Sequence, residues 1–304
     1  MTASPAPAPA PGGRGRPLRV AVFASGSGGN LRAVMRLAFW RPELVQVVVI
    51  VTDRPDCGAV SISERAKIPV ISSDFRAECG RASDCRTQFE QLAYAQRAEA
   101  FHDRIEDRLA QFEHAAGPVD LVVLSYGRWI HGLLLERFAG RMINQHPGDL
   151  TLLDGERNRI LVGNDPVLAA LRLGIPRVRT STFLVDAGED AGPIICQGPA
   201  LGAAGIEAER SSADRLEQIL KRESDWPSVI CAVTLIAEGA VSVDQGRRLE
   251  DGSHGISVCG VPMSFGGLKL MVGLDHPDPR MRQISETVHE SIESCSKNGR
   301  LIDL

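Results

Sequence analysis

Short apolar runs alternate with helical patterns through the first half of the chain. Residues 18–24, 45–51, 68–71 and 119–124 are strand-length runs rich in Val, Ile and Leu, which is typical of strands buried on both faces. Between the first two runs, apolar residues recur every three or four positions, as on one face of a helix, at Leu31, Val34, Met35 and Ala38. This alternation predicts an α/β fold with a doubly wound, mostly parallel sheet.

The second half continues the alternation less regularly. Helical patterns cover residues 133–138, 166–173, 212–221, 227–238 and 280–295, and β-like runs cover 142–144, 180–185, 193–197 and 255–274. A charged segment, residues 85–114, predicts a long helix in which His102 and His114 face solvent. Its inward face is expected to carry Phe101, Ile105, Leu109 and Phe112.

Composition narrows the class of partner. The 304 residues carry a formal net charge of −4, which gives no electrostatic reason to expect nucleic acid or an anionic membrane as a partner. No apolar run approaches the roughly 20 residues that span a bilayer. The seven cysteines are scattered without metal-binding spacing, and the N-terminus lacks a signal-peptide pattern. We therefore expect no metal, and reduced thiols in the cytoplasm.

A glycine-rich turn joins the first apolar run to the first helical pattern. Its candidate anion-binding residues are Gly26, Gly28, Gly29 and Asn30. Glycines allow close approach to the backbone, and the free N–H groups of a helix start favour a negative charge. The dinucleotide fingerprint Gly-x-Gly-x-x-Gly fails at Leu31, where the third glycine would stand. The alternative is an ordinary strand-to-helix turn with no ligand.

Asn144 and His146 lie two positions apart at the end of a predicted strand. Their side chains therefore point to the same side, at the sheet edge where open α/β proteins hold ligands. A carboxamide and a protonated imidazole can both donate to an oxyanion. Asp190, in a glycine-flanked turn, is the candidate carboxylate that favours the charged imidazole. The alternative is a simple strand exit in which His146 caps backbone groups.

Four blocks of sequence, in this order, resemble the folate-dependent formyltransferases. They are Val20 to Leu31 with its Ser-Gly-x-Gly-x-Asn-Leu, the strand 119–124, Asn144-Gln145-His146-Pro147, and the segment 185–197 ending in Asp-x-Gly-Pro-Ile-Ile-x-Gln. The resemblance is closest to the branch that formylates glycinamide ribotide in purine biosynthesis. It implies a Rossmann-like formyltransferase fold and the transfer of one carbon from the co-substrate 10-formyltetrahydrofolate to a small-molecule amine.

The resemblance also implies roles for individual residues. Asn144 and protonated His146 would stabilise the oxyanion that forms when the amine attacks, and Asp190 would assist and accept the amine proton. The glycine loop would hold a phosphate of the acceptor. The folate pocket would be lined by Tyr126, Arg128, Trp129, Ile130, Leu184, Val185 and Asp186.

The organisation of the chain follows from where these blocks lie. We expect residues 1–17, rich in Ala, Pro and Gly, to be a disordered leader. Residues 18–210 would be the catalytic domain, and residues 211–304 a small C-terminal extension of helices and an α/β element. A homodimer is possible on the sequence alone.

Departures from the family pattern leave the identity of the amine acceptor undecided. Gly148-Asp149-Leu150 follows Pro147 where the family has Ser-Leu-Leu-Pro, and Phe183 aligns with a family histidine. The acceptor is therefore glycinamide ribotide or another amine. One alternative is hydrolysis of the formyl-folate, although the hydrolases of this family carry an N-terminal regulatory domain before the first strand. Another is a nucleotide- or folate-binding module without catalysis.

Overall fold

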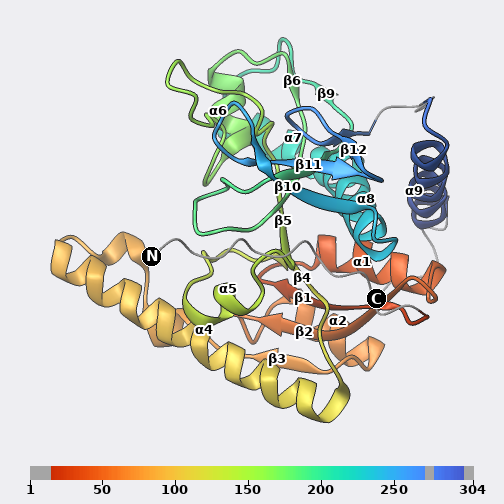
Figure 1. Ribbon diagram of the computed structural model, residues 1–304. Helices are drawn as coiled ribbons and strands as arrows, with labels where there is room; N and C mark the ends of the chain where they lie inside the picture. The colour runs from red at the N-terminus through yellow and green to blue at the C-terminus, as the bar shows by residue number, and fades with distance from the viewer. Residues whose placement is uncertain (1–14, 271–276, 298–304) are drawn as a thin grey trace.

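The computed structural model describes residues 15–270 and 277–297 (Figure 1). Most of the predicted leader, and the end of the predicted β-like segment at 271–274, lie outside the described residues. Of the leader, Arg16 is described, and it forms an ion pair with Asp120 at 2.6 Å. In the described part of the chain, no helix is long and apolar enough to cross a membrane.

One eight-stranded sheet forms the centre of the molecule, in the order β13-β8-β7-β5-β4-β1-β2-β3 (Figure 1). Five neighbouring strands, β5, β4, β1, β2 and β3, run parallel to one another. Strand β7 is antiparallel to both of its neighbours, β5 and β8. The predicted doubly wound, mostly parallel sheet is confirmed. The strands are β1 (Leu18–Ala24), β2 (Val45–Thr52), β3 (Val70–Ser72), β4 (Leu121–Ser125), β5 (Met142–His146), β7 (Ser181–Leu184), β8 (Ile194–Gln197) and β13 (Leu268–Lys269).

Alternate residues of β1 contribute to two separate hydrophobic cores, one on each face of the sheet. Val20 and Val22 pack toward one face, and Ala21 and Phe23 toward the other. The first face is covered by α1 (Gly29–Trp40), α2 (Gly58–Ala66) and α8 (Trp226–Ala237), and α9 (Pro279–Lys297) packs on α1 and α8. The second face is covered by α3 (Phe75–Cys79), α4 (Gln88–Ala116) and α5 (Gly132–Arg137).

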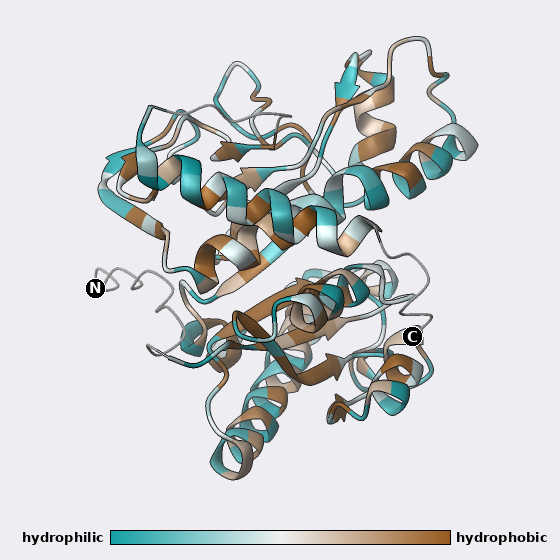
Figure 2. Ribbon diagram, turned by 90° about the vertical axis from the view of Figure 1, so that its right-hand side faces the viewer, coloured by the Kyte–Doolittle hydropathy of each residue, from teal (hydrophilic) through white to brown (hydrophobic). Residues whose placement is uncertain are grey.

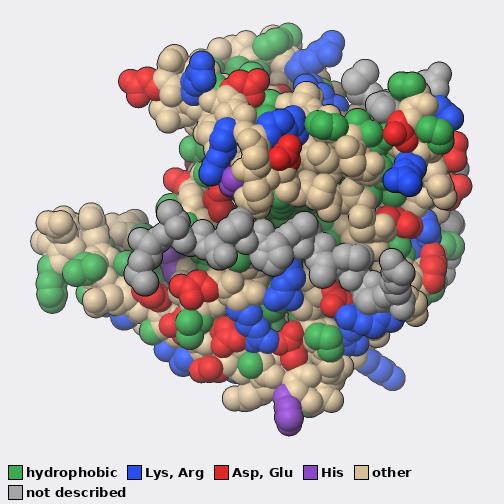
Figure 3. Space-filling view, in the orientation of Figure 1, with side chains coloured by type: hydrophobic (Ala, Val, Ile, Leu, Met, Phe, Trp, Pro, Cys, Tyr) green, Lys and Arg blue, Asp and Glu red, His purple; other side chains and the backbone are tan. Residues whose placement is uncertain are grey.

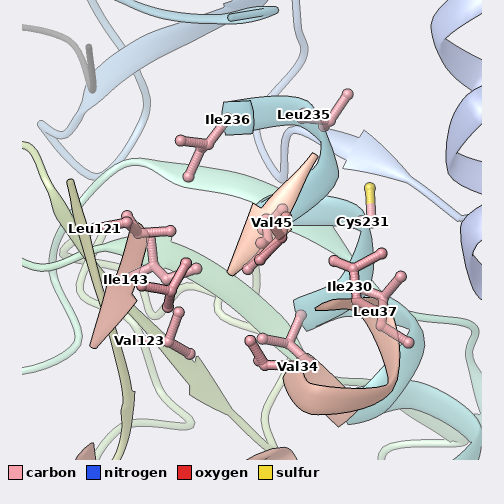
Figure 4. Packing of buried hydrophobic residues seen from close by; sticks show 14 of the residues in the cluster. Val34, Leu37, Val45, Leu121, Val123, Ile143, Ile230, Cys231, Leu235 and Ile236 are labelled. Atoms are coloured by element: carbon pink, nitrogen blue, oxygen red, sulfur yellow. The ribbon is translucent and has the colours of Figure 1, made fainter. Parts of the chain in front are cut away.

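Figure 4 shows the first core from close by. Leu37 of α1 lies beside Ile230 of α8, and Val123 lies beside Ile143 on the strands (Figure 4). These side chains and Val34 belong to one cluster, and all five are almost fully buried. The central strands of the main sheet are apolar along most of their length (Figure 2). Helix α1 is apolar on one side, whereas α8 is buried on nearly all sides. Burial of aliphatic surface is the main stabilising contribution here, worth about 1.5–3 kcal/mol for each large side chain.

Two smaller sheets lie in the upper part of Figure 1. A three-stranded sheet contains β10 (Val241–Arg248), β11 (His254–Val258) and β12 (Val261–Pro262), and β6 (Arg177–Val178) pairs with β9 (Leu201–Gly202). The remaining helices are α6 (Pro166–Arg172), the 3-10 turn η1 (Ala82–Asp84), α7 (Arg210–Leu220) and the π-turn η2 (Lys221–Asp225). Beyond residue 210 the chain still contributes to the main body, because α8 packs on α1 and β13 joins β8.

His102 is an exception to the prediction for the charged helix. Phe101, Ile105 and Leu109 are buried as expected, but His102 is 0% exposed, so its placement in solvent was wrong. Residue 102 follows 101 on the face that packs inward, and its ring lies beside Phe75 and Tyr126. Neither ring nitrogen has a hydrogen-bond partner among the described residues. Burial lowers the pKa of His102 to about 4.

This burial predicts a loss of stability in mild acid. The pKa of His102 is lower in the folded chain than in the unfolded chain, so between pH 6.5 and about 4 the unfolded chain binds more protons. Stability is retained above pH 6.5, and His102 lowers it by up to about 1.4 kcal/mol for each pH unit below that value. Urea denaturation at several pH values should show a shallower acid dependence for His102→Phe. An unchanged slope would mean that His102 is not the titrating group.

Candidate active site

The carboxyl end of β5 carries Asn144 and His146. Asn144 lies opposite Leu124 of β4 and Phe183 of β7, so it stands between a parallel and an antiparallel neighbour. It is half-buried, and its side chain forms no hydrogen bond with any described residue. His146 is 5% exposed. Asn144 therefore has free donors at the edge of the sheet, while His146 is held beneath the surface.

Both ring nitrogens of His146 face oxygen acceptors. Nδ1 lies 3.3 Å from Oδ2 of Asp190, and Nε2 lies 2.6 Å from the backbone carbonyl oxygen of Leu161. Both nitrogens can donate only when the ring carries two protons. The predicted pairing of His146 with Asp190, which lies 44 positions later in the sequence, thus has the contact that it requires.

Opposing influences act on the charge of His146. Burial lowers the pKa of His146, while the Asp190 carboxylate, the Leu161 carbonyl and Glu189 oppose that change. The positive charge of Arg159 acts in the same direction as burial and lowers the pKa further. The protonation of this ring therefore depends on how closely Asp190 is held against it.

Asp190 sits in a turn that the surrounding chain holds in an uncommon conformation. Its φ of 47° is left-handed, a region that residues other than glycine seldom adopt. The backbone N–H of Gly163 donates to Oδ2 of Asp190 at 3.0 Å, and Arg159 donates to the backbone carbonyls of Asp190 and Gly192. The carboxylate is therefore held by contacts with a distant loop, residues 148–164.

The glycine loop lies at the same edge of the sheet. Gly28 has a φ of 80° and is the N-cap of α1, whose first turn has no side-chain cap and no acidic residue. Nδ2 of Asn30 donates to Oε1 of Gln145, between Asn144 and His146, at 3.0 Å. Positive φ at Gly28 explains why a glycine is needed there. The loop thus presents a helix N-terminus beside the end of β5.

Comparisons with known proteins agree with this geometry. Residues 18–226 match the family described as formyl transferase. The chain belongs to the formyl transferase family. The resemblance to the folate-dependent formyltransferases is thereby confirmed, and the protein is a one-carbon transferase.

Individual relatives are similar in sequence and fold. A phosphoribosylglycinamide formyltransferase of Bacillus subtilis is 31% identical over 215 residues, which are 70% of this chain and 92% of the relative. One from Mycobacterium tuberculosis is 30% identical over 184 residues, 60% of this chain and 71% of the relative. The structure of a phosphoribosylglycinamide formyltransferase from Coxiella burnetii has the same fold, with a TM-score of 0.62 and 19% identity, over 84% of this chain and all of that one.

The segment after β4 of this formyltransferase contains several predicted folate-pocket residues, and they differ in exposure. Ile130 is buried, and the hydroxyl of Tyr126 is enclosed with no partner among the described residues. Nε of Arg128 donates to Oδ2 of the buried Asp53 at 2.7 Å. Trp129 is exposed and stacks on His131, with ring centroids 5.6 Å apart. Of these residues, Trp129 is the one that offers a large accessible surface.

The second predicted segment of the pocket adjoins β5. Leu184 lies opposite Ile143, the backbone N–H of Val185 donates to the carbonyl of Met142 at 2.8 Å, and Asp186 begins the turn to Asp190. The segment after β4 reaches the glycine loop through Ser25, whose Oγ accepts from the N–H of Gly127 at 2.9 Å. The structure thus brings the predicted groups to one edge of the sheet.

Sequence reasoning missed the loop that covers His146. The sequence patterns assigned no helix, strand or functional role to residues 148–164, yet Leu161, Gly163 and Arg159 all contact the His146–Asp190 pair or its turn. A Cβ on Gly148 would stand 2.9 Å from the His146 ring and 2.8 Å from the Leu161 oxygen. Glycine after His-Pro was therefore the one available signal that the chain passes close to the ring. Among the described residues, no group of three or more His, Cys, Asp or Glu side chains could hold a metal ion.

Proposed function

We propose that this formyltransferase transfers the formyl group of 10-formyltetrahydrofolate to the amine of glycinamide ribotide or of a closely related small molecule. The observation that carries the proposal is the meeting of Asn144, the His146–Asp190 pair and the glycine loop at one sheet edge. The relatives named phosphoribosylglycinamide formyltransferase support the choice of acceptor. The space-filling view is hollowed between the part that contains α6 and the part that contains α4, with charged side chains of both signs beside the hollow (Figure 3).

The proposed reaction assigns one task to each polar group. The amine nitrogen forms a bond to the formyl carbon, and the bond from that carbon to N10 of the folate breaks. Asn144 donates to the oxyanion, and His146 contributes its positive charge, since its two ring nitrogens face Asp190 and Leu161. Asp190 accepts the proton that the amine loses, and N10 takes up a proton as it leaves.

The substrates would bind on two sides of these residues. The N-terminus of α1, with Gly26, Gly28, Gly29 and Asn30, would hold the phosphate of the acceptor, because its first backbone N–H groups favour an anion. The exposed face of Trp129 suits a planar ring of the folate. Leu184, Val185 and Asp186 would complete that pocket from β7, with Tyr126, Arg128 and Ile130 supporting it from within.

A direct assay tests the proposal. The purified protein, given 10-formyltetrahydrofolate and glycinamide ribotide, should release tetrahydrofolate and formylated amine in equal amounts. Related small amines without a phosphate should react more slowly, because the glycine loop would have no anion to hold.

The same assay separates the alternatives. Release of tetrahydrofolate at the same rate without an amine would favour hydrolysis of the formyl-folate. The absence of folate binding in calorimetry would contradict both enzymatic readings and favour a binding module. A cytoplasmic location and a homodimer stay predictions, and sedimentation measurements would test the second.

A further inference from the structure

A buried ion pair links the C-terminal part of the chain to the loop over His146. Arg159 belongs to residues 148–164, and Asp251 to the turn between β10 and β11, 92 positions later. Nη2 and Nε of Arg159 lie 2.6 and 2.7 Å from Oδ2 of Asp251. The two side chains are only 4% and 5% exposed. Such a pair has little freedom to rearrange, because leaving either charge unpaired in the interior is unfavourable.

Each partner of this pair is held by further contacts. Oδ1 of Asp251 accepts hydrogen bonds from the backbone N–H and the hydroxyl of Ser253, at 3.0 and 2.7 Å. The guanidinium of Arg159 also donates to the carbonyl of Asp190, and to that of Gly192 at 2.9 Å. A planar guanidinium can serve a carboxylate and two carbonyls at once, which a lysine ammonium cannot do in the same geometry.

We propose that Arg159 and Asp251 are positioning residues that hold the Asp190 turn so that its carboxylate faces His146. This inference rests on the proposed function, since it concerns the same catalytic pair. The left-handed φ of Asp190 costs free energy that nearby contacts must offset. Arg159 offsets it by binding the carbonyls of Asp190 and Gly192, and Asp251 fixes the guanidinium from the opposite side.

The first test uses Arg159→Lys and Asp251→Asn, with the pKa of His146 read by NMR titration. The charged groups that act on this ring are Asp190, Glu189 and Arg159. Arg159→Lys keeps the positive charge but loses the shared contacts, so Asp190 should move away and the pKa of His146 should fall. If Arg159 acts through its charge alone, the lysine variant will titrate like the wild type, which would overturn the proposal.

The second test is kinetic. Both variants should lower kcat by about 10- to 100-fold, because a shift of about 1 Å in a catalytic group has effects of that size. KM for either substrate should change less than about threefold, since neither side chain is expected to touch a substrate. The two substitutions together should cost little more than either alone, because they remove one shared contact. Additive losses, or a change in KM alone, would contradict a positioning role.

A third variant covers the case in which the single substitutions unfold the protein. Arg159→Met with Asp251→Leu replaces the pair by apolar side chains of similar volume, which buried sites often tolerate. If this variant folds and keeps the wild-type kcat, the proposal is wrong. If it folds and loses 10- to 100-fold in kcat, the contacts to the Asp190 turn are what matters.

The matched control is Arg210→Lys. Arg210 also pairs with an aspartate, Asp165, at 2.6 Å, but both side chains are at least half exposed. Neither side chain forms a hydrogen bond or ion pair with the Asp190 turn. Its kcat and the pKa of His146 should equal those of the wild type. If the wild type transfers no formyl group to any amine, the proposed function fails, while the NMR comparison still decides whether Arg159 positions Asp190.

Discussion

Replacing Asn144 with alanine is expected to lower kcat for formyl transfer by about 10²- to 10³-fold, the usual effect of losing one oxyanion donor. The carboxamide of Asn144 has no side-chain hydrogen bond to any described residue and stands at the end of β5, where its donors are free. The effect should fall on kcat more than on KM, because the oxyanion exists only as the reaction proceeds. Steady-state kinetics with both substrates measures it.

Asn144→Asp is the matched variant. It keeps the shape of the side chain, replaces the amide donors with acceptors, and adds a negative charge beside the developing oxyanion. Its kcat should be at least as low as that of Asn144→Ala. Both variants should have a melting temperature close to that of the wild type, because the Asn144 side chain forms no hydrogen bond with any described residue. A normal kcat in Asn144→Asp would remove Asn144 from the mechanism.

The second large effect is structural and concerns Gly192, directly after the Asp190 turn. A Cβ on Gly192 would stand 1.7 Å from the backbone carbonyl oxygen of Leu184, so an alanine requires the backbone to move. The N–H of Leu184 also donates to the carbonyl of Pro193 at 3.0 Å, which ties the two strands together at this point. We expect Gly192→Ala to lower the free energy of unfolding by about 3 kcal/mol or more, as measured by urea denaturation.

The control for this substitution lies in the loop 148–164. Gly155 has no atom within 4 Å of the position that a Cβ would take, and its φ is not left-handed. Gly155→Ala should change the free energy of unfolding by less than about 0.5 kcal/mol. If Gly192→Ala and Gly155→Ala changed the free energy of unfolding equally, the close contact with the Leu184 carbonyl would not be the cause of the loss at Gly192.

The strands of the central sheet were largely predictable. The apolar run 18–24 coincides with β1, and 45–51 and 119–124 agree with β2 and β4 within one or two residues at each end. These strands are buried on both faces, so nearly every residue must be apolar, and the run of letters itself marks the element. The long helix was also predicted within three residues at each end, and it begins with a Thr87–Glu90 capping box.

The short strands could not be predicted from the apolar pattern in the same way. β6 and β9 have two residues each, too few to show any period. β12 lies inside the predicted β-like segment 255–274, but that segment contains several short strands rather than one. β10 is eight residues long but was missed, because it is mostly polar and only partly buried, with Val241 as its buried residue. β13 contributes two residues to the edge of the main sheet beside β8, and only the path of the chain in space brings them together.

Some features of the candidate site could likewise be predicted from local sequence, and others depend on tertiary packing. Asn144 and His146 could be paired from sequence alone, because residues two apart in a strand share a side, and Asp190 stood in a recognisable glycine-flanked turn. The burial of His102 and the contact of Leu161 with His146 depend on which elements pack together. Arg159 and Asp251 are separated by 92 positions, and no local pattern relates them.

The sequence by itself therefore determined the sheet, the chemical groups at its edge and the family. The strands and the Asn144–His146 pair depend on the polarity or spacing of residues within a few positions of one another, and the family was indicated by the resemblance of four blocks of sequence. Tertiary structure decided what surrounds the groups: the carbonyl against His146, the held turn of Asp190, and the ion pair behind it. Those features are long-range contacts in which burial and charge act through space, so their strength depends on neighbours that the order of residues does not reveal.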